Sequence, residues 1–163
     1  MNKKIEKNGE KMNIKINNIS AEQIGESLEI KGRIIKVDDS TPLIIKGFYK
    51  CLDCMATYEV TNKKLEHNTK PEMCLDCGSN NIKFMPNQSK YIDSQNLILE
   101  DIEEFVDKYG RKRNPNTIKC VVYGKDVNQH IKSDLVVIKG ILNITIENEM
   151  FIEVTDICLS EEI

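Results

Sequence analysis

Four of the six cysteines lie in two identical CLDC tetrapeptides in the middle of the chain. Cys51 and Cys54 form the first C-x2-C pair, and Cys74 and Cys77 form the second after nineteen intervening residues. A two-residue gap lets both thiolates of one tight turn reach the same ion, and two such turns complete a tetrahedral site. The spacing therefore predicts a zinc ribbon that holds one structural Zn²⁺ and leaves no position open for catalysis.

Other uses of these cysteines are two disulfides, a redox pair or an iron–sulfur cluster, and His67 is an alternative ligand. The N-terminus lacks the apolar core of a secretory signal, so a cytoplasmic protein is expected, and there paired cysteines are more often metal ligands than disulfides. The segment between the pairs has few large apolar residues, so metal binding is expected to supply much of its folding energy. Cys120 and Cys158 lie in apolar strand contexts, where we expect them to be buried.

The elements around the cysteines are predicted to be strands. Alternating, β-branched segments separated by turn residues predict strands at 28–37, 43–50, 95–104, 116–124, 133–146 and 151–159. Gly140 interrupts one of them, which favours a bulge or bend. Residues 20–28 begin with a Ser-x-x-Gln capping box and predict a short N-terminal helix. Five or six short strands favour a small all-β barrel or sandwich.

The order of these segments predicts the domain organisation. Residues 1–27 are expected to form a polar tail and the short helix. The cysteine pairs fall between two predicted strands, so residues 51–88 are expected to form a module inserted into the barrel. The barrel itself is then assigned to residues 28–50 and 89–163.

Composition limits the function classes. The chain has 163 residues and a net charge of −3, so it is not basic overall. Basic residues are nevertheless concentrated locally, because residues 111–125 contain five Lys or Arg and no acid. No apolar run approaches the roughly 20 residues of a membrane helix. His67 and His130 are far apart in polar contexts, and no nucleophile–base pair or G-x4-G-K-[ST] phosphate loop is present, so we expect neither an enzyme nor a nucleotide-binding protein.

Several segments, in order, resemble the N-terminal region of the archaeal and eukaryotic minichromosome maintenance (MCM) replicative helicases. They are GRIIKVDDSTP (32–42), GFYKC (47–51) entering the first CLDC, the second CLDC, and SKYIDSQNLILED (89–101). Gly110, Asp126 and SDLVVIKGI (133–141) extend the similarity, which covers about residues 28–158. The individual positions are Gly32, Pro42, the four cysteines, Ser89, Tyr91, Asp93 and Gln95.

The resemblance implies a five-stranded OB-fold barrel with an inserted four-cysteine zinc ribbon. It also implies a module that acts in DNA replication and binds single-stranded DNA, with duplex DNA as a further ligand. OB barrels bind strands through a basic groove and stacking aromatic side chains. The candidate phosphate contacts are Lys31, Arg33, Lys36, Lys46, Arg111, Lys112, Arg113 and Lys119. The candidate base platforms are Phe48, Tyr49 and Tyr91. A cytoplasmic, nucleoid-associated protein of an archaeon is expected, without ATPase or helicase activity of its own.

The alternative function is a protein-interaction or oligomerisation module. Such a module would assemble with itself, as a hexamer-like ring, or with a full-length MCM helicase that it regulates. The predicted hairpin tip at 144–153 is acidic, and Glu147, Glu149 and Glu153 would repel a DNA phosphate. Residues 126–163 as a whole contain eight acids and two bases, which favours protein contacts there.

Overall fold

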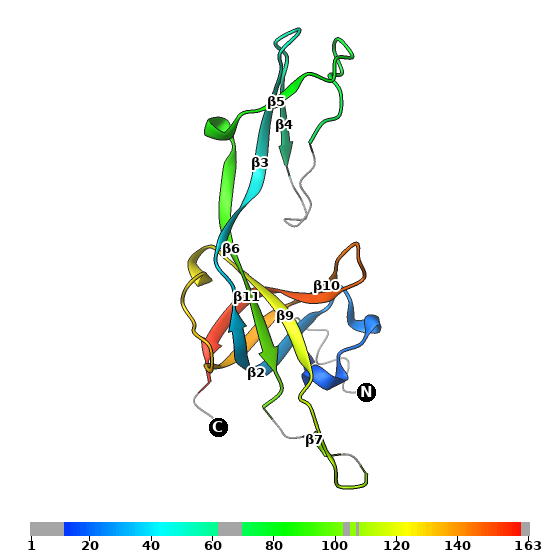
Figure 1. The fold of residues 1–163 in the computed structure, drawn as a ribbon, viewed down its shortest axis with the longest axis vertical. Helices are drawn as coiled ribbons and strands as arrows, with labels where there is room; N and C mark the ends of the chain where they lie inside the picture. The colour runs from blue at the N-terminus through cyan, green and yellow to red at the C-terminus, as the bar shows by residue number, and fades with distance from the viewer. Residues whose placement is uncertain (1–11, 62–69, 103–104, 107, 161–163) are drawn as a thin grey trace. The chain divides into compact units, whose positions relative to one another are not determined.

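The computed structural model describes residues 12–61, 70–102, 105–106 and 108–160 and divides into two compact units (Figure 1). The first unit combines Met1–Ser40 with Ser94–Ile163, and the second is Thr41–Asp93. The second unit contains both cysteine pairs. It begins ten residues before the predicted 51–88 module and ends five residues after it.

The first unit is a closed five-stranded barrel, which confirms the OB-fold expectation. Around the barrel the order is β2, β10, β11, β9 and β6, and β6 pairs with β2 to close it. Neighbours are antiparallel except β9 and β11, which are parallel. The strands are β2 (Ser27–Val37), β6 (Lys90–Glu100, paired within the barrel from Ser94), β9 (Thr117–Tyr123), β10 (Leu135–Ile144) and β11 (Met150–Leu159).

Alternation along the strands builds the barrel core. On β2, Leu28, Ile30 and Ile34 are fully buried, while Lys31 between them is exposed. On β6, Leu97 and Leu99 take the inner positions, opposite Ile118 and Cys120 of β9. Burial raises the pKa of the Cys120 thiol to about 12, so this cysteine is a small apolar core residue, as predicted.

Two β-bulges interrupt the alternation of inward and outward side chains along the barrel strands. The register of β10 against β11 shifts at Gly140, where an added Cβ would collide with the backbone carbonyl oxygen of Glu153. The predicted bulge is therefore confirmed. Because the shift skips one residue of β11, Ile157 faces the core and Cys158 faces solvent. The expectation that Cys158 is buried was wrong for this reason.

The second bulge lies on β2 between Ile34 and Lys36. Strict alternation would place Lys36 on the opposite face from Lys31 and Arg33. The extra residue rotates the end of the strand, so that Lys36 pairs with the outward-facing Ile98 of β6 and its side chain is 68% exposed. All three β2 cations therefore lie on the outer surface of the barrel.

The N-terminal segment contains two short 3₁₀ turns and no α-helix among its described residues. The helix predicted over 20–28 is limited to the turn η2 (Ala21–Gln23), although its Ser20–Gln23 capping box is present. The backbone leaves helical geometry at Ile24, which has a ψ of 128°. Gly25 follows with a φ of +92°, and Ser27 already belongs to β2. The other elements here are β1 (Met12–Asn13), parallel to β2, and η1 (Ile16–Asn18). In the described part of the chain, no helix is long and apolar enough to cross a membrane.

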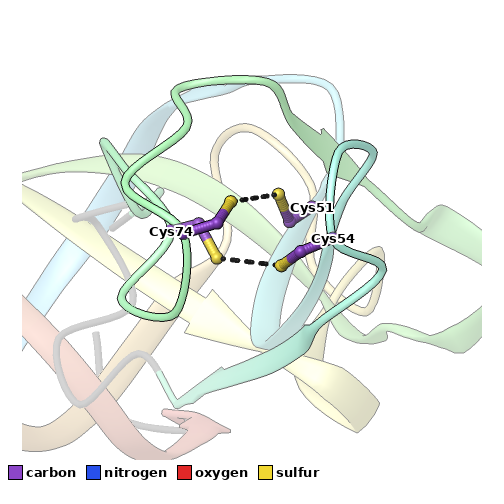
Figure 2. Close-up of side chains that lie close together, drawn as sticks. Cys51, Cys54 and Cys74 are labelled. Atoms are coloured by element: carbon purple, nitrogen blue, oxygen red, sulfur yellow. Dashed lines mark hydrogen bonds between the residues drawn. The ribbon is translucent and has the colours of Figure 1, made fainter.

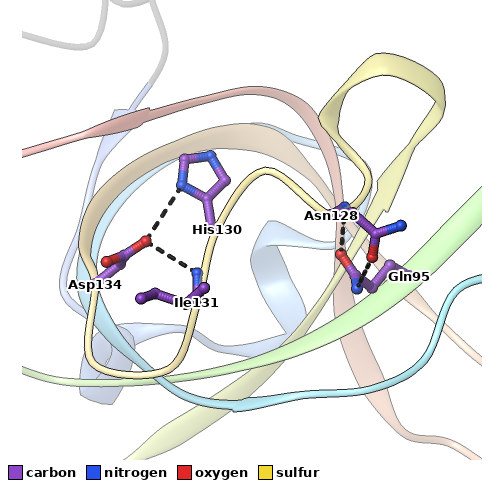
Figure 3. Close-up of polar contacts among 5 residues, drawn as sticks. All are labelled: Gln95, Asn128, His130, Ile131 and Asp134. Carbon is purple, nitrogen blue, oxygen red and sulfur yellow. Dashed lines mark hydrogen bonds and ion pairs between the residues drawn. The ribbon is translucent and has the colours of Figure 1, made fainter.

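Side-chain hydrogen bonds fix the connection from η4 (Gly124–Asp126) to β10 (Figure 3). The buried Gln95 amide donates to the Asn128 side chain and to the Asp38 carbonyl, both at 2.9 Å, and accepts from the Asn128 backbone at 3.0 Å. Farther on, Asp134 lies 3.7 Å from His130 Nδ1 and accepts the backbone N–H of Ile131. Gln95 is therefore held by three hydrogen bonds, and His130 lies beside the Asp134 carboxylate without a hydrogen bond to its Nδ1.

The second unit is built on β3 (Thr41–Cys51), which pairs with β4 (Thr57–Thr61) and β5 (Ile82–Phe84). The turn η3 (Pro86–Gln88) follows β5. Ser89 accepts the Phe48 backbone N–H at 2.9 Å and donates to the Met85 carbonyl, and the Tyr91 hydroxyl donates to the Pro86 carbonyl. Ser89 and Tyr91 thus fix the return from β5 to β6.

Candidate metal centre and nucleic-acid interface

The two CLDC sequences form two turns with the same backbone hydrogen bonds. Met55 N–H donates to the Cys51 carbonyl and Gly78 N–H to the Cys74 carbonyl, both at 2.9 Å. The residue after each pair has positive φ, 68° for Met55 and 75° for Gly78. Repetition of the tetrapeptide therefore repeats the turn, and each turn directs two sulfurs toward the other.

The four sulfurs converge on one point (Figure 2). All four Sγ atoms lie within 4.8 Å of one another, and the pairs Cys51–Cys77 and Cys54–Cys74 are separated by 3.6 and 3.5 Å. Sulfurs bonded to a tetrahedral zinc at about 2.3 Å lie about 3.8 Å apart, so these distances fit that ion. They are much longer than a disulfide, and all six cysteines are free. His67 lies outside the described residues.

A tyrosine supports this sulfur cluster. The Tyr58 hydroxyl lies 2.9 Å from Cys74 Sγ and accepts the Leu75 backbone N–H at 3.0 Å. This hydroxyl, followed by backbone N–H groups of Cys77 and Asp76, lowers the pKa of the Cys74 thiol to about 6. The lowered pKa favours the thiolate of Cys74, which is the form that ligates metals. The Ala56 backbone N–H acts in the same direction on Cys54, but hydrogen bonds with the other three thiols together with burial outweigh it and raise the pKa of the Cys54 thiol to about 12.

The apolar core of this unit is small. Its buried members are Tyr49, Cys51, Cys74 and Ile82, with the Tyr49 ring 5.5 Å from Phe84. Two of these four residues are cysteines of the sulfur cluster. Tyr49 is 2% exposed and packs in this core, so it does not act as a base platform. Little apolar area is left to stabilise the unit without a metal.

The predicted cations are divided between the two units. Lys46 lies on β3 in the cysteine unit and pairs with Glu59 at 3.4 Å. Three cations of the barrel have carboxylate partners on its outer surface, because Arg33 lies 3.7 Å from Glu100, Lys36 3.7 Å from Asp38 and Lys119 3.9 Å from Glu149. These ion pairs are at least partly exposed, so each contributes little stability and can exchange its carboxylate for a phosphate.

The register of the barrel brings Lys36 and Lys119 into one row across four strands. Lys36 of β2 pairs with Ile98 of β6, Ile98 with Lys119 of β9, and Lys119 with Phe151 of β11. Directly paired residues point to the same face. The outer face therefore carries two cations with an apolar side chain between them, and we call these four residues the outer row. Phe151 is only 2% exposed, so the accessible part of the row is Lys36, Ile98 and Lys119. A cavity of about 410 Å³ borders Ile98 and Lys119.

The RKR run lies on a separate hairpin between β6 and β9. Its strands are β7 (Phe105–Val106) and β8 (Lys112–Arg113). Arg111 and Lys112 are exposed, and the side chain of Arg113 lies outside the described structure. Sequence reasoning missed Tyr109, which is 69% exposed and has Arg111 5.1 Å from its ring centre. The signal was an aromatic residue beside the basic run.

Two acidic side chains of the hairpin between β10 and β11 have donor groups of the same chain as partners. Glu149 pairs with Lys119, and Glu153 accepts from Tyr123 at 3.2 Å and from Asn143 at 2.7 Å. Two of the three acids expected to repel phosphate therefore contact donors of the barrel. Glu147, at the tip, is exposed.

Comparison with known protein families assigns most of the chain to an OB domain, as the barrel does. The family model described as "MCM OB domain" matches residues 15–146. The match includes four of the five barrel strands and the whole cysteine unit.

Curated relatives are distant and much longer. The chain is 26% identical over 93 residues to the zygotic DNA replication licensing factor mcm6 of Xenopus tropicalis, covering 55% of this chain and 11% of the relative. It is 24% identical over 134 residues to the DNA replication licensing factor MCM4 of Oryza sativa subsp. japonica. That alignment covers 80% of this chain and 15% of the relative. It is 26% identical over 136 residues to the minichromosome maintenance protein MCM of Saccharolobus solfataricus. That alignment covers 80% of this chain and 19% of the relative. The chain thus spans less than a fifth of the length of these relatives.

Proposed function

Because the chain belongs to the MCM OB domain family, we propose that it is a single-stranded DNA-binding module that acts in DNA replication without ATPase activity of its own. The observation that carries this proposal is the accessible part of the outer row, Lys36, Ile98 and Lys119. β6 and β9 are the second and third strands of the barrel in chain order, and OB folds bind oligonucleotides on that face.

Charge and shape in the outer row suit an unpaired strand. Lys36 and Lys119 lie on the two β-strands that flank Ile98, so they are two strand spacings apart. They can therefore contact different phosphates of one DNA strand. Ile98 between them offers an apolar contact to a base. Asp38 and Glu149 now pair with these lysines, and a phosphate must displace them. We therefore expect weak binding that depends strongly on salt.

Changing both Lys36 and Lys119 to alanine is expected to weaken binding to a labelled oligothymidine. Fluorescence anisotropy titrations at several salt concentrations should show the salt slope falling by about 0.7 for each lysine–phosphate pair removed. Lys139→Ala is the matched control, because Lys139 lies on β10 with a carboxylate partner, Glu29, at 4.0 Å. No binding by the parent protein even at low salt would eliminate the proposal.

The cysteine unit supports this function through its fold. We propose that Cys51, Cys54, Cys74 and Cys77 hold one structural Zn²⁺, because the sulfur separations match a tetrahedral zinc site. When bound, the ion crosslinks the two CLDC turns. Four thiolates fill its coordination shell, so it has no part in chemistry.

The second candidate function is assembly, either with further copies of this chain or with a full-length MCM helicase. It is favoured by apolar side chains exposed on both CLDC turns, where Leu52 is 45%, Met55 59% and Leu75 85% exposed. Apolar side chains left in water are typical of protein contact sites.

Light scattering on the zinc-loaded protein is expected to show an assembled species if this second function holds. Leu75→Ser should then dissociate it, since this side chain contributes contact area without supporting the core of its own unit. Leu159→Ser is the control, because Leu159 is 61% exposed on β11. A monomer at all protein concentrations would exclude self-assembly and leave contact with a full-length helicase to be tested by titration.

A further inference from the structure

The β7–β8 hairpin carries an aromatic ring surrounded by cations. Tyr109 lies in the turn and is 69% exposed. Lys108 Nζ lies 5.2 Å from the centre of its ring, and the guanidinium carbon of Arg111 lies 5.1 Å from it. Lys112, also exposed, begins the returning strand. We call Lys108, Tyr109, Arg111 and Lys112 the hairpin tip.

Folding does not require this arrangement. A ring that is two-thirds exposed buries little apolar area, and a cation–aromatic contact at an exposed site contributes only about 0.5–1 kcal/mol. An anionic ligand with planar bases would contact these cations and cover the ring. The hairpin tip therefore has the composition that single-stranded nucleic acids contact, a stacking platform with phosphate-binding cations.

The base of the hairpin connects it to the nucleic-acid face proposed for the barrel. The hairpin joins the end of β6 to the start of β9, the two central strands of the outer row, and extends beyond them in Figure 1. Asp101 N–H donates to the Asn116 carbonyl at 3.1 Å and closes the base. Asp101 also accepts the Ile16 backbone N–H at 3.1 Å, which anchors the base to the N-terminal segment.

We propose that the hairpin tip is a second contact for single-stranded nucleic acid, in which a base stacks on Tyr109 while Lys108, Arg111 and Lys112 contact the flanking phosphates. This inference rests on the proposed function and extends it from the barrel to the hairpin. Two contacts on one chain raise the affinity for a long oligonucleotide more than for one that spans only the barrel face.

A tryptophan probe tests this stacking directly, because the chain contains no tryptophan. In Tyr109→Trp, oligothymidine is expected to quench the fluorescence of the introduced indole, and quenching should saturate at the same concentration as the anisotropy signal. Leu159→Trp is the matched control, because Leu159 is 61% exposed on β11 and belongs neither to the outer row nor to the hairpin tip. Its fluorescence is expected to change little.

Affinity measurements separate stacking from charge. Tyr109→Ala is expected to weaken binding of a long oligothymidine roughly tenfold or more, whereas Tyr109→Phe should retain near-parent affinity because it keeps the ring. Circular dichroism and thermal melting should be unchanged, since the side chain is exposed. Polyglutamate, which has charge without bases, should bind equally to the parent and to Tyr109→Ala.

The outcomes distinguish this inference from the proposed function. Binding by anisotropy without quenching in Tyr109→Trp, or unchanged affinity in Tyr109→Ala, would overturn the hairpin contact while retaining DNA binding by the barrel. Polyglutamate binding that falls with Tyr109→Ala would instead indicate an acidic protein partner. Absence of any oligonucleotide binding would overturn both proposals.

Discussion

Removal of the bound metal with a chelator is expected to unfold Thr41–Asp93 while the five-stranded barrel remains folded. Among the described residues, the core cluster of the cysteine unit has four buried members and that of the barrel unit has sixteen. Two of the four are cysteines, so the core of this unit depends on the ion that the sulfurs share. Structural zinc contributes about 10–16 kcal/mol to the folding of small zinc-binding peptides. The barrel contributes no residue to the described sulfur cluster and does not need that stabilisation.

Hydrogen exchange followed by mass spectrometry measures both units in one experiment. Without metal, we expect the amide protons of β3 and β4 to become unprotected and those of β9 and β10 to stay protected. Cys54→Ser should have the same effect without a chelator, whereas Cys158→Ser should leave metal content at one ion per chain. Full protection of β3 and β4 in metal-free protein would show that the unit folds without the sulfur cluster.

Replacing Leu99 with alanine is expected to destabilise the barrel by about 2–5 kcal/mol. Leu99 is fully buried on β6, and its side chain lies against Gly32 of β2, where an added Cβ would come within 2.9 Å of Leu99 Cδ2. Truncation removes apolar packing at the pair of strands that closes the barrel and leaves a cavity there. Urea unfolding monitored by circular dichroism measures the decrease in stability.

The neighbour on the same strand is the matched control for this change. Ile98 faces outward and is half-buried, so Ile98→Ala is expected to cost about 1 kcal/mol. Metal content should be the same in both variants, because both residues belong to the barrel unit. Equal destabilisation by the two changes would contradict the inward and outward assignment of β6.

Much of the strand framework was predictable because burial in a barrel imposes a period of two. The predicted strand at 28–37 is β2 at Ser27–Val37, and the predicted strand at 151–159 is β11 at Met150–Leu159. The cluster of four sulfurs was predictable for a different reason, since C-x2-C spacing is a local property of a tight turn. Neither depended on knowing the rest of the fold.

The positions of the cations were less predictable. The outward direction of Lys36 depends on a bulge between β2 and β6, and strand alternation alone assigns it to the other face. Pairing of Arg33 with Glu100 and of Lys119 with Glu149 depends on interactions between segments far apart in the chain. The helix predicted over 20–28 failed because the backbone leaves helical geometry at Ile24, and the Gly25 N–H then donates to the Leu142 carbonyl of β10 at 2.7 Å. Propensity and capping signals do not report such tertiary constraints.

The central claim is that the outer face of the barrel binds single-stranded DNA, and an NMR titration of the zinc-loaded protein tests it most directly. Oligothymidine is added to ¹⁵N-labelled protein, and the backbone amide shifts of both units are followed. We expect the largest shifts at Lys36, Ile98 and Lys119, decreasing as salt is raised. Shifts confined to the CLDC turns, or no shifts at low salt, would contradict the claim.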